Sequence, residues 1–167
     1  MTTTGYRPEQ RIVEVEALTP KGWISARIHI GKINLLLDAM NAAPAFLRLT
    51  QVTFQDGHFV SFLALRRNAV QVLIPHEPSD QLARQNPAET AVKRIGCVMP
   101  YGHIEGDLRL LPDIRVSDFL VKCKGFVLLN NCTADVRHED QATVSALFQP
   151  SPSALVNVEA LLGVTEL

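Results

Sequence analysis

The sequence predicts a mainly β fold, α+β only in a minor sense, made of two tandem duplicated units. Each unit is expected to run strand-strand-helix-strand-strand-strand with one short helix. Three observations predict this fold: an internal repeat, alternating polarity and regularly placed turn residues. Pro20 and Gly22 recur 80 residues later as Pro100 and Gly102. A unit of about 70 to 80 residues is near the lower limit for burying an adequate core. We therefore expect small β-barrels or half-barrels that dock tightly or share a core.

The first unit is predicted over residues 11–75. Residues 11–18 alternate between apolar and charged side chains, which indicates a strand with one solvated face. Pro20 and Gly22 supply a turn, and residues 23–30 return as the second strand of a hairpin. Alternation turns one set of residues toward the core: Ile24, Ala26, Ile28 and Ile30. It turns the other set toward solvent: Trp23, Ser25, Arg27 and His29.

A short helix should follow this hairpin. Asn34 is its predicted N-cap, and Pro44 prevents its continuation. Three further strands are predicted at residues 46–54, 59–65 and 69–74. Residues 75–90 then hold three prolines and little apolar content, so we predict a linker over 76–91.

The second unit is predicted over residues 92–160 and follows the same plan. Ser117 and Asp118 open its helix, and Gly125 ends it. Its predicted strands are, in order, 92–99, 103–110, 126–134, 143–149 and 154–158. Residues 161–167 should cap the unit as a short helix or fray.

Charge is nearly balanced overall but differs between the two halves. The chain has a formal net charge of -1, which argues against electrostatic binding of nucleic acid by the whole molecule. Residues 1–75 carry eight Lys and Arg against five Asp and Glu, a net of +3, whereas residues 76–167 carry eight against twelve, a net of -4. Such an asymmetry either reflects drift between the two copies or orients a head-to-tail assembly.

Cysteine usage and hydropathy set the expected compartment. Three cysteines in the second half, an odd number, argue against a disulfide framework. The N-terminal residues contain no apolar signal core, and no apolar run approaches the length of a membrane span. We expect a cytoplasmic bacterial protein that does not insert into membranes.

Motifs that carry chemistry are absent. The five histidines show no metal-ligand spacing, and the chain has no C-x-x-C, no phosphate-binding loop and no nucleophile elbow. We therefore predict no catalytic residue, no cofactor and no metal. One alternative uses Cys97 and His103, which flank a hairpin turn together with nearby acids, as a small-molecule-binding or enzymatic site. Strand alternation gives a simpler account, in which Cys97 packs inward and His103 faces solvent.

The surface of the two hairpins supplies the candidate partner-binding residues. In the second hairpin, Ile104, Leu108 and Leu110 should point inward, so that Glu105 and Asp107 point outward. Exposed aromatic side chains are enriched at protein interfaces, and each hairpin has one aromatic residue that either points outward or folds over the edge of its own core. Arg27 and Asp107 occupy equivalent positions with opposite charge, as pairing between the two copies would require. The predicted partner-binding set is Trp23, Arg27, Tyr101, Glu105 and Asp107.

Several short segments resemble known domains. The helix V-S-D-F-L at 116–120 and the strand F-V-L-L-N-N at 126–131 resemble an uncharacterised family of small bacterial strand-strand-helix-strand domains. The resemblance covers about 70 residues per copy and implies no activity. More remotely, the last strands of the first unit look like those of an Sm-like barrel, a class that forms rings and often binds single-stranded RNA. That resemblance implies RNA binding at the turn formed by Arg66, Arg67 and Asn68, where the second copy has Pro150–Pro152.

These observations predict a non-enzymatic structural or adaptor protein. It would act through self-assembly, as a homo-oligomer, or by binding a protein partner, because short edge strands invite strand-edge pairing. An Sm-like RNA-binding module is one alternative, and the Cys97 and His103 site is the other.

Overall fold

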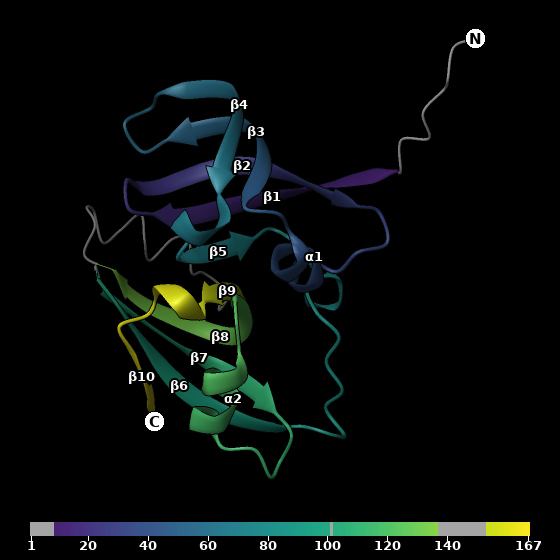
Figure 1. Ribbon diagram of the computed structural model, residues 1–167, viewed down its shortest axis with the longest axis vertical. Coiled ribbons are helices and arrows are strands. Elements are labelled where there is room, and N and C mark those ends of the chain that lie inside the picture. The colour runs from purple at the N-terminus through teal and green to yellow at the C-terminus, as the bar shows by residue number, and fades with distance from the viewer. Residues whose placement is uncertain (1–8, 101, 137–152) are drawn as a thin grey trace.

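A computed structural model describes residues 9–100, 102–136 and 153–167. In these residues ten antiparallel strands form one sheet, in the order β10-β6-β7-β8-β9-β5-β1-β2-β3-β4, with two short α-helices (Figure 1). The predicted mainly β class is confirmed. The described sheet is open, with β4 and β10 as its two ends, so closure of each unit into a barrel is not observed.

The elements of the two repeats occur in the same order. The first repeat contains β1 (Gln10–Thr19), β2 (Gly22–Gly31), α1 (Leu36–Ala42), β3 (Phe46–Phe54), β4 (Phe59–Arg66), the 3-10 helix η1 (Arg67–Ala69) and β5 (Val72–Pro75). A further 3-10 helix, η2 (Ser79–Gln81), lies between the repeats. The second repeat contains β6 (Ala91–Met99), β7 (Gly102–Leu110), α2 (Val116–Lys122), β8 (Phe126–Val136), β9 (Ala154–Asn157), the 3-10 helix η3 (Val158–Ala160) and β10 (Gly163–Glu166).

The duplication extends to irregular details of the backbone. Pairing slips between Ser25 and Arg27 in β2, and it slips again between Glu105 and Asp107 in β7. Opposite these slips, Gln51 and Asn131 adopt positive φ angles of 52° and 49°. Non-glycine residues rarely adopt this conformation, and an extra residue in a bulge explains why both do. The alternation predicted for both hairpins is confirmed, although Trp23, on the face opposite Ile24, is buried rather than exposed.

The C-terminal part of the second repeat differs from the prediction. The segment β9-η3-β10 corresponds to the end of β4, η1 and β5, because its elements have the same order and η3 closes with the same hydrogen bond as η1. In this part of the repeat the spacing is 91 residues rather than 80. Val70 N–H donates to Arg67 O at 3.1 Å, and Leu161 N–H donates to Val158 O at 3.2 Å. Residues 163–166 are therefore a strand, and the prediction of a helical cap or frayed end was wrong. Short apolar runs do not reveal which strand of a repeat they form.

This correspondence also changes the equivalence of the turn at Arg66–Asn68. Its counterpart is residues 157–159, and the Pro150–Pro152 segment lies outside the described residues. The strand predicted at 143–149 lies outside them as well.

The two repeats are joined by strand pairing in the middle of the sheet. Strand β5 of the first repeat pairs with β1 of its own repeat and with β9 of the second (Figure 1). The side chains of β5 and β9 are buried on both faces, as expected for strands covered from two sides. Successive residues alternate between two hydrophobic cores, with Leu73 and Leu155 in the first core and Val72 and Val156 in the second.

Each core receives side chains from the other repeat. The first core, which is otherwise built by the first repeat, includes Phe126, Leu128 and Leu155. The second core, which is otherwise built by the second repeat, includes Leu18, Trp23, Val72 and Ile74. The repeats therefore have two cores, and each core is built from residues of both repeats.

The helices and the linker complete the first core. Helix α1 begins at Leu36 with Leu35 at the N-cap position and no side-chain cap, so the prediction of Asn34 as N-cap was wrong. The linker is packed rather than loose at Leu82, which is buried in the first core and accepts a hydrogen bond from Leu37 N–H at 2.9 Å. In the described part of the chain, no helix has the length and apolarity needed to cross a membrane.

Candidate functional site

The junction between the repeats is a built interface with specific hydrogen bonds. Val72 faces Val156 and Leu73 faces Leu155 across β5 and β9. Asn157 adds two hydrogen bonds to the residues that directly precede β5. Its N–H donates to Gln71 O at 2.9 Å, and its side-chain Nδ2 donates to Val70 O at 3.0 Å. Asn157 is buried, so these bonds satisfy polar groups that water does not reach.

Helix α1 also contacts the second repeat. The Asn41 side chain donates from Nδ2 to Phe126 O at 3.0 Å and accepts at Oδ1 from Phe126 N–H at 2.7 Å. This pair of bonds saturates the backbone of the first residue of β8, and the ring of Phe126 is only 2% exposed. The junction thus combines strand pairing, a buried ring and a side-chain amide clamp.

The counterparts of these junction residues lie at the two open ends of the sheet. Phe46, the counterpart of Phe126, is 48% exposed, and Val121, the counterpart of Asn41, is 85% exposed. On β4, Ala64 is exposed although its counterpart Leu155 is fully buried. Beside β10, Val98 is 44% exposed, whereas the equivalent Leu18 is fully buried.

An open groove of about 660 Å³ lies next to β10, between α2 and the end of η3. Its lining includes Lys93, Ser117, Leu120, Leu161, Val164 and Glu166. The corresponding place in the first repeat is filled by Leu82, whose carbonyl meets the N–H of Leu37, the counterpart of Ser117. As a result Met40 is buried in the first repeat, while the equivalent Leu120 of the second repeat is only half-buried.

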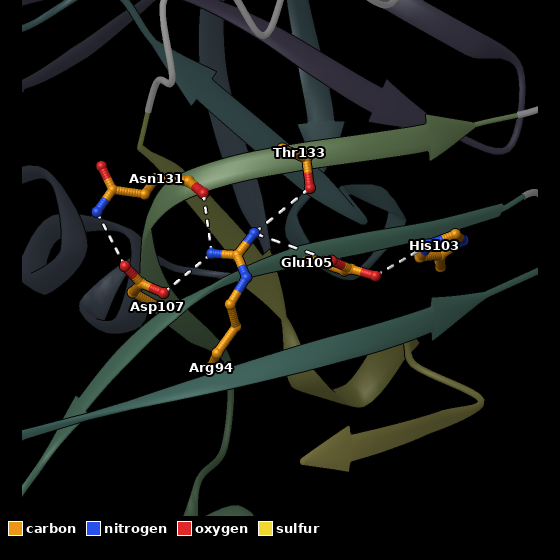
Figure 2. Close-up of polar contacts among 6 residues, drawn as sticks. All are labelled: Arg94, His103, Glu105, Asp107, Asn131 and Thr133. Atoms are coloured by element: carbon orange, nitrogen blue, oxygen red, sulfur yellow. Dashed lines mark hydrogen bonds and ion pairs between the residues drawn. The ribbon is translucent and has the colours of Figure 1, made fainter. Parts of the chain in front are cut away.

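A polar network covers the outer face of the second hairpin (Figure 2). Arg94 on β6 donates to Asp107 Oδ1 at 2.9 Å and to Asn131 O at 3.3 Å, and it approaches Thr133 Oγ1 at 3.5 Å. Asn131 Nδ2 donates to Asp107 Oδ2 at 2.9 Å. The hydrogen bond from Asn131, together with the bond and charge of Arg94, lowers the pKa of Asp107 although partial burial opposes this shift. The carboxylate therefore stays ionised and accepts hydrogen bonds.

The first repeat carries the same pair with its charges exchanged. Glu14 and Arg27 face each other on β1 and β2 with Oε1 and Nη2 3.2 Å apart. Their counterparts are Arg94 and Asp107, which form the equivalent pair in the second repeat. Arg27 and Asp107, whose opposite charges would suit pairing between the two copies, each contact a partner on the adjacent strand of their own repeat. Glu105 lies 3.6 Å from His103 and 3.9 Å from Arg94.

Two aromatic residues complete the predicted partner-binding set. Trp23 lies on the face opposite Ile24, as alternation predicts, but it is buried in the second core, so its expected exposure was wrong. The sheet continues past β1 into the second repeat, which covers the face of the hairpin that alternation assigns to solvent. Tyr101 lies outside the described residues.

In the basic turn of the first repeat, Arg66 and Arg67 contact neighbouring residues of their own repeat. Arg67 donates from Nη1 to Ala43 O at 2.8 Å and to Asn41 O at 3.2 Å, at the C-terminal end of α1. The Arg66 guanidinium lies over the Phe46 ring, 5.4 Å from its centroid. Asn68 is exposed within η1.

Cys97 and His103 do not meet. Cys97 faces Ile104 across the hairpin and is fully buried, whereas His103 faces Val98 and is half-exposed, so the two side chains lie on opposite faces. Burial raises the pKa of the Cys97 thiol to about 11, which keeps it protonated at neutral pH. Among the residues that the structure describes, no group of three or more His, Cys, Asp and Glu could hold a metal ion.

Fold and site together define a duplicated β-sheet protein with one internal strand-pairing junction and two open counterparts of it. No protein-family model, curated protein or solved structure matches the chain. The resemblances to small bacterial domains and to Sm-like barrels therefore rest on the quoted motifs alone.

Proposed function

We propose that this chain is a non-enzymatic structural or adaptor protein that binds other polypeptides through its open strand edges, as a self-assembling protein or with a protein partner. Each repeat acts as a half-barrel that is completed by its neighbour. The observation that carries the proposal is the pairing of β5 with β9, since the equivalent outer edges of β4 and β10 have no described strand beside them.

Physical chemistry supports binding at these edges. An edge strand presents unpaired N–H and C=O groups, and an added strand satisfies them while neighbouring side-chain pockets supply specificity. Phe46 and Val98 are large apolar side chains exposed beside the two edges. Exposed apolar groups that border unpaired strands favour a polypeptide partner over a small polar ligand.

Site-specific photo-crosslinking in cells tests this function. A photoreactive amino acid placed at Ala64 on β4, or at Val164 on β10, should form adducts with a polypeptide that mass spectrometry then identifies. Ile12 is the matched control, because it is exposed at 54% and its counterpart Val92 is also exposed at 49%, so the internal junction covers neither position. Absence of adducts at both edge positions would contradict the proposal.

A further inference from the structure

We infer that the polypeptide at these edges is a second copy of this chain, whose β4 pairs with β10 in the register of the β5–β9 junction. This inference rests on the proposed function and names its partner. The Val156–Val72 pair of the internal junction corresponds to Leu65 of one copy opposite Gly163 of the other. The Leu155–Leu73 pair corresponds to Ala64 opposite Val164.

Strand β10 presents the same backbone arrangement as β5. Strand β5 pairs with β1 from Leu18 opposite Val72 to Val15 opposite Pro75, and β10 pairs with β6 in the equivalent register. The entry into both strands is fixed by the same bond: Gln71 N–H donates to Leu18 O at 2.8 Å, and Leu162 N–H donates to Val98 O at 2.8 Å. The bond from Asn157 N–H to Gln71 O therefore has an available counterpart, from Arg66 N–H of one copy to Leu162 O of the other.

Several apolar side chains at the two edges are exposed in a single chain. Transfer of the junction geometry brings Val121 of one copy against Phe46 of the other, where Asn41 and Phe126 meet within the chain. An apolar contact thus replaces the amide clamp. Leu162 is 71% exposed and corresponds to Gln71, which is buried at the internal junction. A second copy docked in this register would cover all of these exposed side chains.

The groove beside β10 borders the second core. Within the chain, Leu155 of β9 and Phe126 of β8 close the first core. Their counterparts Ala64 and Phe46 would close the second core of a neighbouring copy at the groove next to Val164. The transferred register places Ala64 opposite Val164, which lines the groove.

Charge favours the same polarity of docking. The first-repeat edge carries Arg48 and Arg66 on β3 and β4, and the second-repeat side carries Glu166 on β10, which also lies 3.4 Å from Lys93 of its own chain. The formal charges of the two halves have the same arrangement as the edges, with +3 on residues 1–75 and -4 on residues 76–167. Opposite charge steers encounter and penalises like-to-like docking. Because the two edges are different surfaces, the contact is heterologous and continues into a closed ring or a filament.

Cysteine pairing tests the register directly. Cys97 lies opposite Val164 on β6 and Cys123 is half-buried, so both variants are made in a Cys97→Ala and Cys123→Ala background. Ala64→Cys and Val164→Cys chains in this background, purified separately and then mixed under mild oxidation, should form a mixed disulfide between two chains. Directly opposed residues of paired antiparallel strands have Cα atoms about 4.5–5.5 Å apart, which a disulfide spans. An Ile12→Cys and Val92→Cys mixture is the control and should remain unlinked.

Light scattering after size-exclusion chromatography tests the assembly itself. The wild-type chain should exceed monomer mass, and Phe46→Glu should weaken self-association about tenfold or more, because a charge would be buried at the contact. Phe46 is half-exposed in a single chain, so this variant should keep the wild-type circular dichroism spectrum. Val121→Asn, which recreates the residue of the internal clamp, should preserve assembly, and Ile12→Glu should leave it unchanged.

A folded wild-type chain that stays monomeric at high concentration and forms no mixed disulfide would overturn the inference. In that event, crosslinks at Ala64 or Val164 to a different protein would leave the proposed function standing. Absence of any adduct would remove both.

Discussion

At the scale of single residues, the two repeats place different side chains at equivalent positions, and burial follows the neighbour rather than the residue type. Phe46 and Phe126 are identical residues on equivalent strands, yet only Phe126 is covered. Glu14–Arg27 and Arg94–Asp107 exchange charges while keeping the same cross-strand geometry. The acidic and basic residues of such a pair can exchange places, because both belong to the same hairpin.

Thiol reactivity should separate the three cysteines. Burial raises the pKa of Cys97 to about 11 and that of Cys132 to about 12, and both thiols are inaccessible, whereas Cys123 is half-buried. A thiol reagent at neutral pH should therefore label Cys123 first and the other two only after denaturation. Mass spectrometry of the labelled protein gives the order, with Cys123→Ala as the control. Rapid labelling of Cys97 in the folded state would instead support the enzymatic alternative.

The Asp107 network should give a pH-dependent contribution to stability. The folded pKa of Asp107 is lowered, so its contribution is present above the unfolded pKa of about 3.9 and is lost as the pH falls through the folded value. Asp107→Asn should lower the free energy of unfolding by up to about 1 kcal/mol at pH 7, and this difference should shrink below about pH 4. Urea unfolding at several pH values measures it.

Glu14→Gln is the matched control for this measurement. The Glu14–Arg27 pair is more exposed than the Arg94–Asp107 pair, so its loss should have a smaller effect. An equal loss in both variants, or a loss in Asp107→Asn that does not change with pH, would contradict the electrostatic role of Asp107.

At the scale of elements, the segment between the repeats is part of the first core. Leu82 is buried against α1, and Arg11 of β1 holds the same segment through an ion pair with Glu77 and a bond to Gln81 O. The second repeat has no described residue at the position of Leu82, which leaves its groove open. A linker residue thus makes two otherwise similar helix surfaces differ.

Leu82→Ala should destabilise the chain strongly. Removing a buried leucine side chain costs about 2–5 kcal/mol, because the transfer free energy is lost and a cavity remains. Denaturant unfolding monitored by circular dichroism measures this change. Ile33→Ala is the control, since Ile33 is exposed and its truncation should change stability little. A small effect of Leu82→Ala would show that the segment does not support the first core.

At the scale of the whole molecule, each repeat contributes side chains to the core of the other repeat. Trp23, the single tryptophan of the chain, belongs to the first repeat but lies in the second core. Leu155 belongs to the second repeat but lies in the first core. Unfolding of either repeat therefore removes side chains from the core of the other repeat.

We expect one cooperative unfolding transition. Trp23 fluorescence and far-ultraviolet circular dichroism should give coincident curves in denaturant, as two-state behaviour requires. Phe126→Ala removes a ring from the first core and should still shift the Trp23 transition to lower denaturant, by the same amount as the circular dichroism transition. Two separated transitions would indicate that the repeats unfold independently.

The sequence by itself determined the local structure and the duplication. Period-two alternation identified the inward faces of both hairpins, Pro and Gly marked their turns, and the 80-residue repeat predicted equivalent helices. These features depend on interactions between residues close in the chain. The inward side chains of each hairpin were predictable because a strand has only two faces.

Only the tertiary structure decided how the repeats combine. The apolar runs of β5 and β9 have no polar face to fix their neighbours, so their pairing across repeats could not be predicted from the pattern. The same pairing buried Trp23 on a face that alternation assigns to solvent. It also made β10, rather than β9, the final strand and left β4 and β10 as open edges. Long-range pairing depends on which surfaces are already covered, and that information is distributed over the whole chain.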